Sequence, residues 1–194
     1  MLNHLINKNI ILGSGSPRRA ELLEKMGISF EVKTYPTDET YPEHLSPNQI
    51  AEYLAKKKAK PFLDLINTND LVITADTIVN KNGRILNKPA NYLEAFEMIQ
   101  SLSNATHSVI TGVALTSKSQ QIIFNSVTSV TFCELSDKEI NHYIKTYKPF
   151  DKAGAYGIQE WIGDVGVLEI KGSYQNVIGL PTQALYNHLK NFEY

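Results

Sequence analysis

The sequence predicts a mixed α/β (α+β) fold in which a mixed sheet is flanked by helices. Short apolar runs rich in β-branched residues, typical of buried strands, occur between segments that carry helix caps and helical spacing. An Asn-Gly turn at residues 82–83 joins two extended segments and is typical of an antiparallel hairpin. Two long β-rich runs then follow each other with no helix pattern between them. These observations argue against a strictly alternating parallel sheet.

The chain is expected to begin with a strand that leads directly into a helix. The short apolar run Asn9–Leu12 is typical of a buried strand. Ser16 is a suitable N-cap residue, Pro17 suits the first helical position, and Gly27 follows the apolar stripe as a stop signal. We expect a second strand over residues 30–34.

The next part of the chain is expected to form a loop, a helix and further strands. Residues 35–45 are rich in proline and acids, and Ser46 with Gln49 forms a capping box that begins a helix reaching about Lys60. A strand is expected over 71–74, with extended chain continuing over 77–80 into a hairpin turn at 81–83. The remaining expected elements are a helix capped by Asn91, strands over 107–116 and 121–132, a helix begun by a capping box at Ser136, a strand over 165–171 and a helix over 181–191.

Composition limits the classes of protein to which the chain can belong. Its 194 residues are 42% apolar, which suffices for a core, and we expect a single domain over 1–194. Lys and Arg number 19 and Asp and Glu 20, so the net charge of −1 argues against a nucleic-acid-binding module with a broad basic face. Cys133 cannot form an internal disulfide, and neither a membrane span nor a signal-peptide pattern is found. We therefore expect a soluble, cytoplasmic protein.

The segment Gly13–Arg19 has the character of an anion-binding turn. Small residues lead from the expected strand into a helix start, where unpaired N–H groups favour a negative ligand. Arg18 and Arg19 lie in the first helical turn, although arginine is unfavourable at the positive end of a helix unless an anion is present. The spacing matches neither a Walker loop nor a dinucleotide fingerprint. The alternative is a pair of solvated arginines on an ordinary amphipathic helix.

Two acidic positions could support catalysis or cation binding. Asp76 comes directly after an expected buried strand, and the carboxyl ends of strands are where open α/β sheets place ligands. Asp38 and Glu39 lie in the proline-flanked loop and could bind a hard cation such as Mg²⁺. Pro89 directly follows Lys88 and is expected to stiffen the loop that carries this lysine. The alternatives are a turn cap at Asp76 and a solvated loop at 38–39.

Two loops rich in small and amide residues complete the candidate features. Residues 151–159, DKAGAYGIQ, are a poor helix and a poor strand, and we expect a loop that closely approaches a ligand and ends in the amide of Gln159. Residues 172–181, GSYQNVIGLP, have the same character.

Together these segments resemble the Maf-like family. GSGSPRRAELL, ADTIV with KP, TGVAL, and DKAGAYGIQ with GSYQNVIGLP occur in the family's order, and the resemblance extends from about Ile10 to Leu189. It implies a nucleoside triphosphate pyrophosphatase, a fold similar to inosine triphosphatases with two lobes around a deep cleft, a homodimer, and dependence on a divalent cation, Mg²⁺ or Mn²⁺. The subgroup with ADT and YGIQ resembles the dTTP/UTP enzymes, whereas a sister subgroup acts on 7-methyl-GTP.

The resemblance also implies roles for individual residues. Asp76 would be the proton acceptor; the specificity positions would be Arg18, Thr77 and Gln159; and the positions that handle the polyphosphate would be Ser14, Arg19, Lys58 and Lys88. The metal candidates are Asp38, Glu39 and Asp76. Many relatives have alanine in place of Gly13 and glycine in place of Glu160 or Trp161, and the second departure could reshape the rim of the base pocket.

We therefore hypothesise hydrolysis between the α- and β-phosphates, with Asp76 activating water and Gln159 reading the pyrimidine edge. An amide suits an imide edge that offers one donor between two acceptors. The alternatives are 7-methyl-GTP as substrate, or a non-catalytic nucleotide sensor that regulates cell division.

Overall fold

The structure is a computed structural model that describes residues 2, 5 and 7–192. Its helices and strands follow in the order β1 (Asn9–Leu12), α1 (Pro17–Lys25), β2 (Glu31–Val32), α2 (Pro47–Ala59), β3 (Asp70–Lys81), β4 (Arg84–Leu86), α3 (Tyr92–Leu102), β5 (Thr106–Thr116), β6 (Gln121–Phe132), α4 (Asp137–Tyr147), α5 (Trp161–Gly166), β7 (Val167–Lys171), α6 (Tyr174–Ile178) and α7 (Thr182–Lys190). Short 3₁₀ turns occupy Lys60–Phe62 and Ala153–Ala155.

The sheet is mixed, as the sequence predicts. In the described part of the chain seven strands pair in the order β2-β1-β3-β5-β6-β7, with β4 added alongside β3. Strand β1 is parallel to both β2 and β3, whereas β3 with β4 and β6 with β7 are antiparallel. The hairpin between β3 and β4 turns at Asn82 and Gly83, both at positive φ, which is the backbone requirement that favours Asn-Gly.

The chain divides into two compact units. The first contains the described residues of 1–76, 111–126 and 179–194, and the second contains 77–110 and 127–178. Each of the long strands β3, β5 and β6 is divided between the units, with one segment in the first unit and one in the second. Among the residues described, no helix has the length and apolar character required to cross a bilayer.

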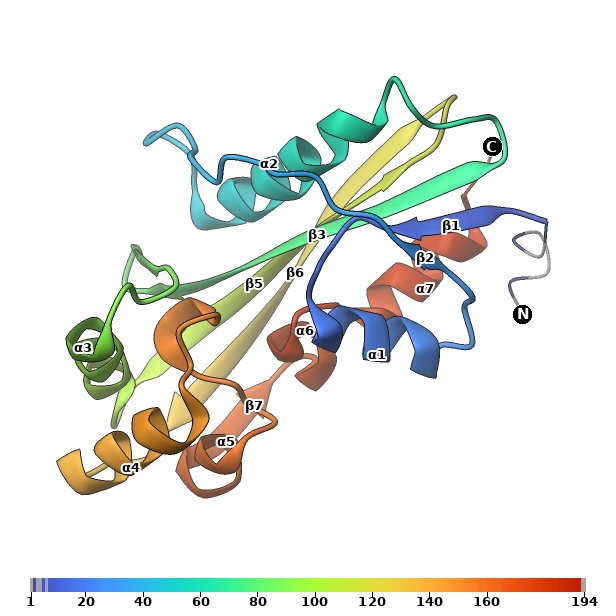
Figure 1. Cartoon of the computed structure of the whole chain (residues 1–194). Coiled ribbons are helices and arrows are strands. Elements are labelled where there is room, and N and C mark those ends of the chain that lie inside the picture. Colours follow the sequence, from blue (N-terminus) through green and yellow to red (C-terminus); the bar gives the residue numbers. More distant parts are fainter. Residues whose placement is uncertain (1, 3–4, 6, 193–194) are drawn as a thin grey trace. The chain divides into compact units, whose positions relative to one another are not determined.

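In the first unit α2 packs on one side of the sheet, and α1 and α7 lie on the other (Figure 1). The contact with α2 is unusually close because Gly112 of β5 has no side chain: a Cβ there would overlap the carbonyl group of Ala51. The Thr74 hydroxyl of β3 donates to the Ala55 carbonyl of the same helix at 2.7 Å. These contacts fix the helix that carries Lys58.

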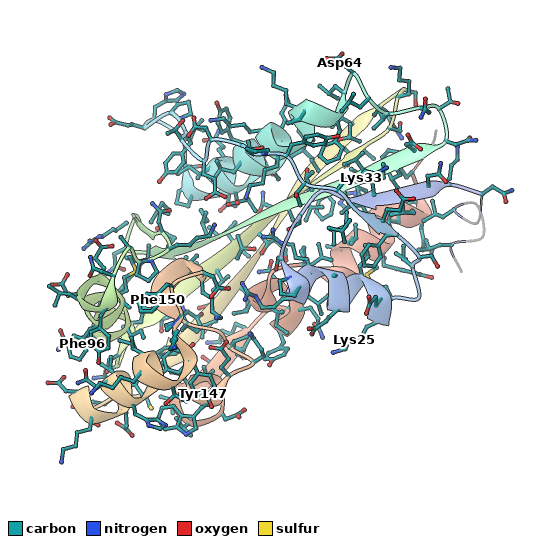
Figure 2. The ribbon with its side chains drawn as sticks, viewed as in Figure 1. Lys25, Lys33, Asp64, Phe96, Tyr147 and Phe150 are labelled. Carbon is teal, nitrogen blue, oxygen red and sulfur yellow. The ribbon has the colours of Figure 1, made fainter. Side chains whose placement is uncertain are left out.

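The second unit has its own core, in which α3 and α4 meet the β-strands. Its largest fully buried side chains are Tyr143 and Phe132, and the rings of Phe132, Tyr156 and His107 pack edge to face. Phe96 packs against this core, whereas Tyr147 and Phe150 are exposed (Figure 2).

Two segments differ from the sequence expectation. The expected strand over 165–171 begins only at Val167, because residues 161–166 form helix α5. The expected loop over 172–181 contains helix α6. The backbone N–H of Asn176 in this helix donates to the Ser173 hydroxyl at 3.2 Å. Both helices are short and also make contacts with distant parts of the chain, which no local pattern displays: the Cys133 N–H donates to the Gly166 carbonyl at the end of α5, and the Asn176 side chain of α6 donates to the Val109 carbonyl.

Candidate functional site

The turn between β1 and α1 is held closely against β3. The Gly13 N–H donates to the Ile73 carbonyl at 2.8 Å, and a Cβ on Gly13 would lie 2.6 Å from the Thr74 methyl. Glycine rather than alanine therefore suits this chain at position 13. Ser16 occupies the N-cap position, but its side chain makes no capping hydrogen bond, and the first turn of α1 contains no acid. The helix start thus keeps the positive character predicted for an anion site.

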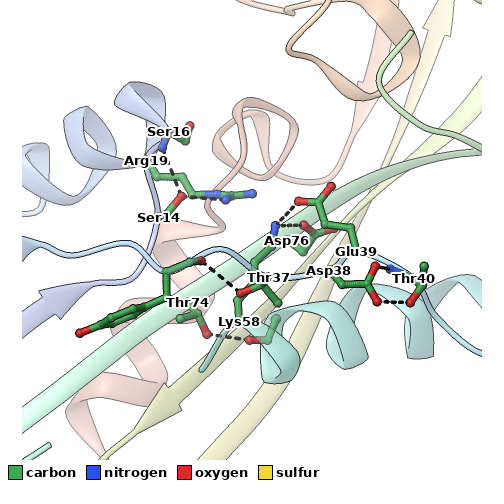
Figure 3. Close-up of polar contacts among 12 residues, drawn as sticks. Ser14, Ser16, Arg19, Thr37, Asp38, Glu39, Thr40, Lys58, Thr74 and Asp76 are labelled. Carbon is green, nitrogen blue, oxygen red and sulfur yellow. Dashed lines mark hydrogen bonds and ion pairs between the residues drawn. The ribbon is translucent and has the colours of Figure 1, made fainter. Parts of the chain in front are cut away.

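Arg19 is fixed by two hydrogen bonds on the inner side of this turn. Its Nη1 donates to the Ser14 hydroxyl at 3.0 Å (Figure 3). Its Nε donates to the Gly179 carbonyl at 2.8 Å. Burial lowers the pKa of the Arg19 guanidinium, the charges of Asp76 and Glu39 raise it, and the neighbouring charge of Arg18 lowers it. Arginine keeps its charge in proteins, so Arg19 is a fixed, partly desolvated cation near two acids.

The ammonium of Lys58, on α2, joins the two acids. Its Nζ lies 2.8 Å from a Glu39 carboxylate oxygen and also donates to Oδ1 of Asp76 (Figure 3). The Asp76 side chain is only 11% exposed and that of Glu39 is 47% exposed. We refer to Ser14, Arg19, Glu39, Lys58 and Asp76 as the Lys58 cluster. All of it lies in the first unit.

The sequence-based position of Asp76 needs correction. Asp76 does not follow a strand; it lies inside β3, which continues to Lys81. Strand β1 ends at the pair Leu12 and Ile73, whereas β3 continues and pairs with β4 from Val79 onward. Asp76 therefore lies beyond the carboxyl end of β1, on a neighbouring strand that passes this point. The short length of β1 and the long pairing of β3 are tertiary facts that the sequence pattern could not supply.

Asp38 lies outside the Lys58 cluster. Its carboxylate accepts from the Thr40 N–H at 2.9 Å and from the Thr40 hydroxyl (Figure 3). It also pairs with Lys57 at 3.0 Å. The Thr40 bonds, followed by Lys57, lower the pKa of Asp38 to about 2. No group of three His, Cys, Asp or Glu residues among those described is arranged to hold a metal. Within the Lys58 cluster the Glu39 and Asp76 carboxylates both lie against the Lys58 ammonium, and carboxylate oxygens are the type of ligand that a hard divalent ion prefers.

The other expected site residues include three in the second unit. Thr77 is half-buried in β3 directly after Asp76, and Lys88 and Gln159 are exposed. The segments of Lys88 and Gln159 meet, because the Gly154 N–H donates to the Asn87 carbonyl at 3.3 Å. Gly154, at φ 69°, packs directly on Val79.

Asn176 is a structural residue that the sequence reasoning did not single out. Its amide is fully buried and donates to the Val109 carbonyl at 3.1 Å and to the Thr128 hydroxyl at 3.0 Å. It thereby attaches α6 to β5 and β6. The only local signal was that Asn176 directly precedes the apolar pair Val177 and Ile178, which does not reveal that its amide is buried.

Comparison with known proteins shows the family of the chain. A family model described as Maf-like protein matches residues 9–192. A protein of Phocaeicola vulgatus named dTTP/UTP pyrophosphatase is 53% identical over 191 residues, which cover 98% of this chain and 99% of that protein. A protein of Flavobacterium psychrophilum with the same name is 49% identical over 185 residues, or 95% of each chain. Among solved structures, the Ham1 protein of Staphylococcus aureus aligns with a TM-score of 0.47 at 15% identity, over 67% of this chain and 73% of that one.

The family match spans nearly every described residue, and it includes the β1–α1 turn, Asp76 and the loop that ends in Gln159. The chain belongs to the Maf-like protein family.

Proposed function

We propose that the protein is a nucleoside triphosphate pyrophosphatase that hydrolyses dTTP and UTP to the nucleoside monophosphate and pyrophosphate. The names of its relatives support this substrate class. The observation that carries the proposal is the Lys58 cluster, in which one ammonium lies between two carboxylates in the same unit as the fixed guanidinium of Arg19.

Arg19 and Lys58 supply two of the positive charges that a triphosphate needs, and a divalent cation held by the two carboxylates would supply the rest. A nucleoside triphosphate carries about four negative charges, and the protein as a whole has a net charge of −1, so the neutralising groups must be local. The forked guanidinium of Arg19 suits phosphate oxygens, and Lys58 adds a compact charge. The uncapped start of α1 contributes N–H donors on the same turn.

Glu39 and Asp76 are the residues that would hold the divalent cation, Mg²⁺ or Mn²⁺. Magnesium in nucleotide enzymes is commonly held by one or two carboxylates together with substrate phosphates and water. When bound, such an ion supplies positive charge to the reacting phosphates.

Asp76 is the base in the proposed reaction. Its carboxylate takes a proton from water while the water oxygen bonds to the α-phosphorus, and the bond from that phosphorus to the bridging oxygen breaks. The electron pair leaves with pyrophosphate, whose charge Arg19 and Lys58 stabilise. Proton transfer of this kind contributes on the order of 10² to 10⁴ in rate.

Roles for the remaining positions rest on the family resemblance. We propose that Arg18, Thr77 and Gln159 select the nucleotide and that Lys88 binds the polyphosphate. The same resemblance supports a homodimer in the cytoplasm.

A nucleotide panel tests the proposed function directly. Pyrophosphate release should be fastest with dTTP and UTP, should require Mg²⁺ or Mn²⁺, and should stop with EDTA. Faster hydrolysis of 7-methyl-GTP would reject the substrate assignment. Binding of dTTP without any release of pyrophosphate would instead support a nucleotide sensor.

A further inference from the structure

A second group of buried charges lies in the second unit. The Glu160 carboxylate receives the Lys152 ammonium at 3.1 Å and also accepts from the Tyr143 hydroxyl. The side chains of Lys152 and Glu160 are only 9% and 17% exposed. Lys152 has a second acidic partner, the exposed Asp151, at 2.8 Å. Buried ion pairs of this kind are often no more stable than apolar packing, so their value can lie in fixing one geometry.

Tyr143 connects this ion pair to the backbone of the loop that ends in Gln159. Its hydroxyl oxygen accepts from the Gly157 N–H at 2.9 Å while its proton is donated to Glu160. Burial, followed by the hydrogen bond to Glu160, raises the pKa of the Tyr143 phenol. The phenol therefore stays protonated and keeps a single donor direction. We refer to Tyr143, Lys152, Gly157 and Glu160 as the Glu160 network.

Gln159 lies within the turn that this network fixes. The Glu160 N–H donates to the Gly157 carbonyl at 3.0 Å and closes a turn around residues 158 and 159. A Cβ on Gly157 would lie 2.8 Å from Cδ of Glu160 and 2.9 Å from Nε2 of Gln159. The amide of Gln159 and the carboxylate of Glu160 therefore both lie against Gly157. The Gln159 side chain itself is exposed and available to a ligand.

We propose that Glu160 and Tyr143 are positioning residues for substrate specificity: the Glu160 network holds the turn 157–160 so that the Gln159 amide meets the pyrimidine in one orientation. This inference rests on the proposed function, in which Gln159 reads the base. Cytosine differs from thymine and uracil at the edge that an amide would read, since it presents an amino group in place of a carbonyl. Loss of the network should therefore weaken discrimination between dTTP and dCTP.

The test compares the ratio of kcat/KM for dTTP to that for dCTP in five proteins: wild type, Gln159→Ala, Tyr143→Phe, Glu160→Gln and the double variant Tyr143→Phe/Gln159→Ala. Tyr143→Phe keeps the buried ring and removes only the hydroxyl that holds Gly157. We expect the ratio to fall about tenfold in Tyr143→Phe and in Glu160→Gln, the size of one hydrogen bond. The fall should come mainly from a higher KM for dTTP. In the Gln159→Ala background, Tyr143→Phe should not change the ratio further.

Tyr147→Phe is the matched control. Tyr147 lies on the same helix and stacks on Tyr143 at 5.1 Å between ring centroids, but it is partly exposed and outside the network. Its variant should keep the wild-type ratio, and thermal unfolding should show that the network variants remain folded.

The outcomes separate this inference from the proposed function. A wild-type protein that hydrolyses neither dTTP nor UTP, or a Gln159→Ala variant with an unchanged ratio, overturns the base-reading role and the inference with it. A lower ratio in Gln159→Ala, with wild-type ratios in folded Tyr143→Phe and Glu160→Gln, overturns the inference alone. If Tyr143→Phe lowers the dTTP/dCTP ratio equally in the wild-type and Gln159→Ala backgrounds, Tyr143 does not act through the Gln159 amide. That result also overturns the inference.

Discussion

The positive charge of Lys58 offsets the negative charges of two acids, because Glu39 and Asp76 both pair with its single ammonium. Asp76 is nearly buried, so an ionised carboxylate there needs a charged partner in place of water. The Glu39 carboxylate is more exposed, so water can replace the Lys58 ammonium as its partner with a smaller loss of free energy. The lysine thus keeps two acids side by side that would otherwise repel each other. In the proposed reaction, a divalent cation that binds with the triphosphate would take over this charge compensation and leave the Lys58 ammonium to the phosphate oxygens.

Arg19 offers a test of phosphate binding by a single residue. Arg19→Lys keeps the charge, but a lysine cannot bond both Ser14 and Gly179 through a planar fork. We expect kcat/KM for dTTP to fall by about ten- to a hundredfold, the value of a charged hydrogen bond. Steady-state kinetics measures this effect. Arg84→Lys, at an exposed position of β4, is the control and should behave as wild type. A kcat/KM for Arg19→Lys equal to wild type would remove Arg19 from substrate binding.

At the scale of elements, the close contact between α2 and β5 is expected to contribute to the stability of the fold. Gly112→Ala would place a methyl group on the backbone of Ala51, and backbone yields less readily than a side chain. We expect the free energy of unfolding to fall by about 1–3 kcal/mol or more, as for other overpacked sites. Urea unfolding measures this change.

Gly15→Ala is the matched control for that substitution. A Cβ on Gly15 would lie 3.7 Å from the Thr34 methyl, an ordinary contact, so its unfolding midpoint should be unchanged. Equal midpoints for Gly112→Ala and Gly15→Ala would show that the contact with α2 can relax without cost.

The elements that the sequence predicted well are those with local signals. The capping boxes at Ser46 and Ser136 begin α2 and α4 as expected, and Asn91 caps α3, because each side chain bonds a backbone group three residues away. The Asn-Gly hairpin has the same local origin. Helices α5 and α6 escaped prediction because distant contacts support them: the Cys133 N–H donates to the Gly166 carbonyl of α5, and the Asn176 side chain of α6 donates to Val109 of β5 and Thr128 of β6.

The residues of the candidate site were named from the sequence, but their arrangement was not. Arg19 and Asp76 were selected from sequence features and Lys58 from the family resemblance, and the structure joins Lys58 to Asp76. The Gly179 carbonyl that fixes Arg19 lies 160 residues away in the chain, and no pattern connects the two. Asp38 and Glu39 are adjacent in sequence yet bond different lysines, Lys57 and Lys58, and no sequence pattern separates their roles.

At the scale of the whole molecule, stability should depend on pH through His107. This side chain is 2% exposed, and its Nε2 lies 2.7 Å from the Tyr156 hydroxyl. Its Nδ1 has no hydrogen-bond partner among the described residues. Burial, with a smaller contribution from the charge of Lys81, lowers the pKa of His107 to about 4.

The direction of the effect follows from the protons bound by each state. Between about pH 6.5 and the folded-state pKa of about 4, the unfolded chain binds the proton and the folded chain does not, so stability falls as the pH falls. The loss approaches about 3 kcal/mol at the low end of this window. Urea unfolding at about pH 7 and about pH 5 should show a larger loss in wild type than in His107→Gln. The same loss in both proteins would assign the pH dependence to other groups.

The central claim is that Asp76 is the base of a pyrophosphatase whose cations bind the triphosphate, and Asp76→Asn tests it most directly. Pyrophosphate release from dTTP and nucleotide binding by calorimetry should be measured on the same preparation. The exposed Asp64, labelled in Figure 2, provides the control variant Asp64→Asn. The account predicts that Asp76→Asn lowers the rate by on the order of 10² to 10⁴ while dTTP still binds, and that Asp64→Asn matches wild type. Wild-type turnover in a folded Asp76→Asn protein would contradict it.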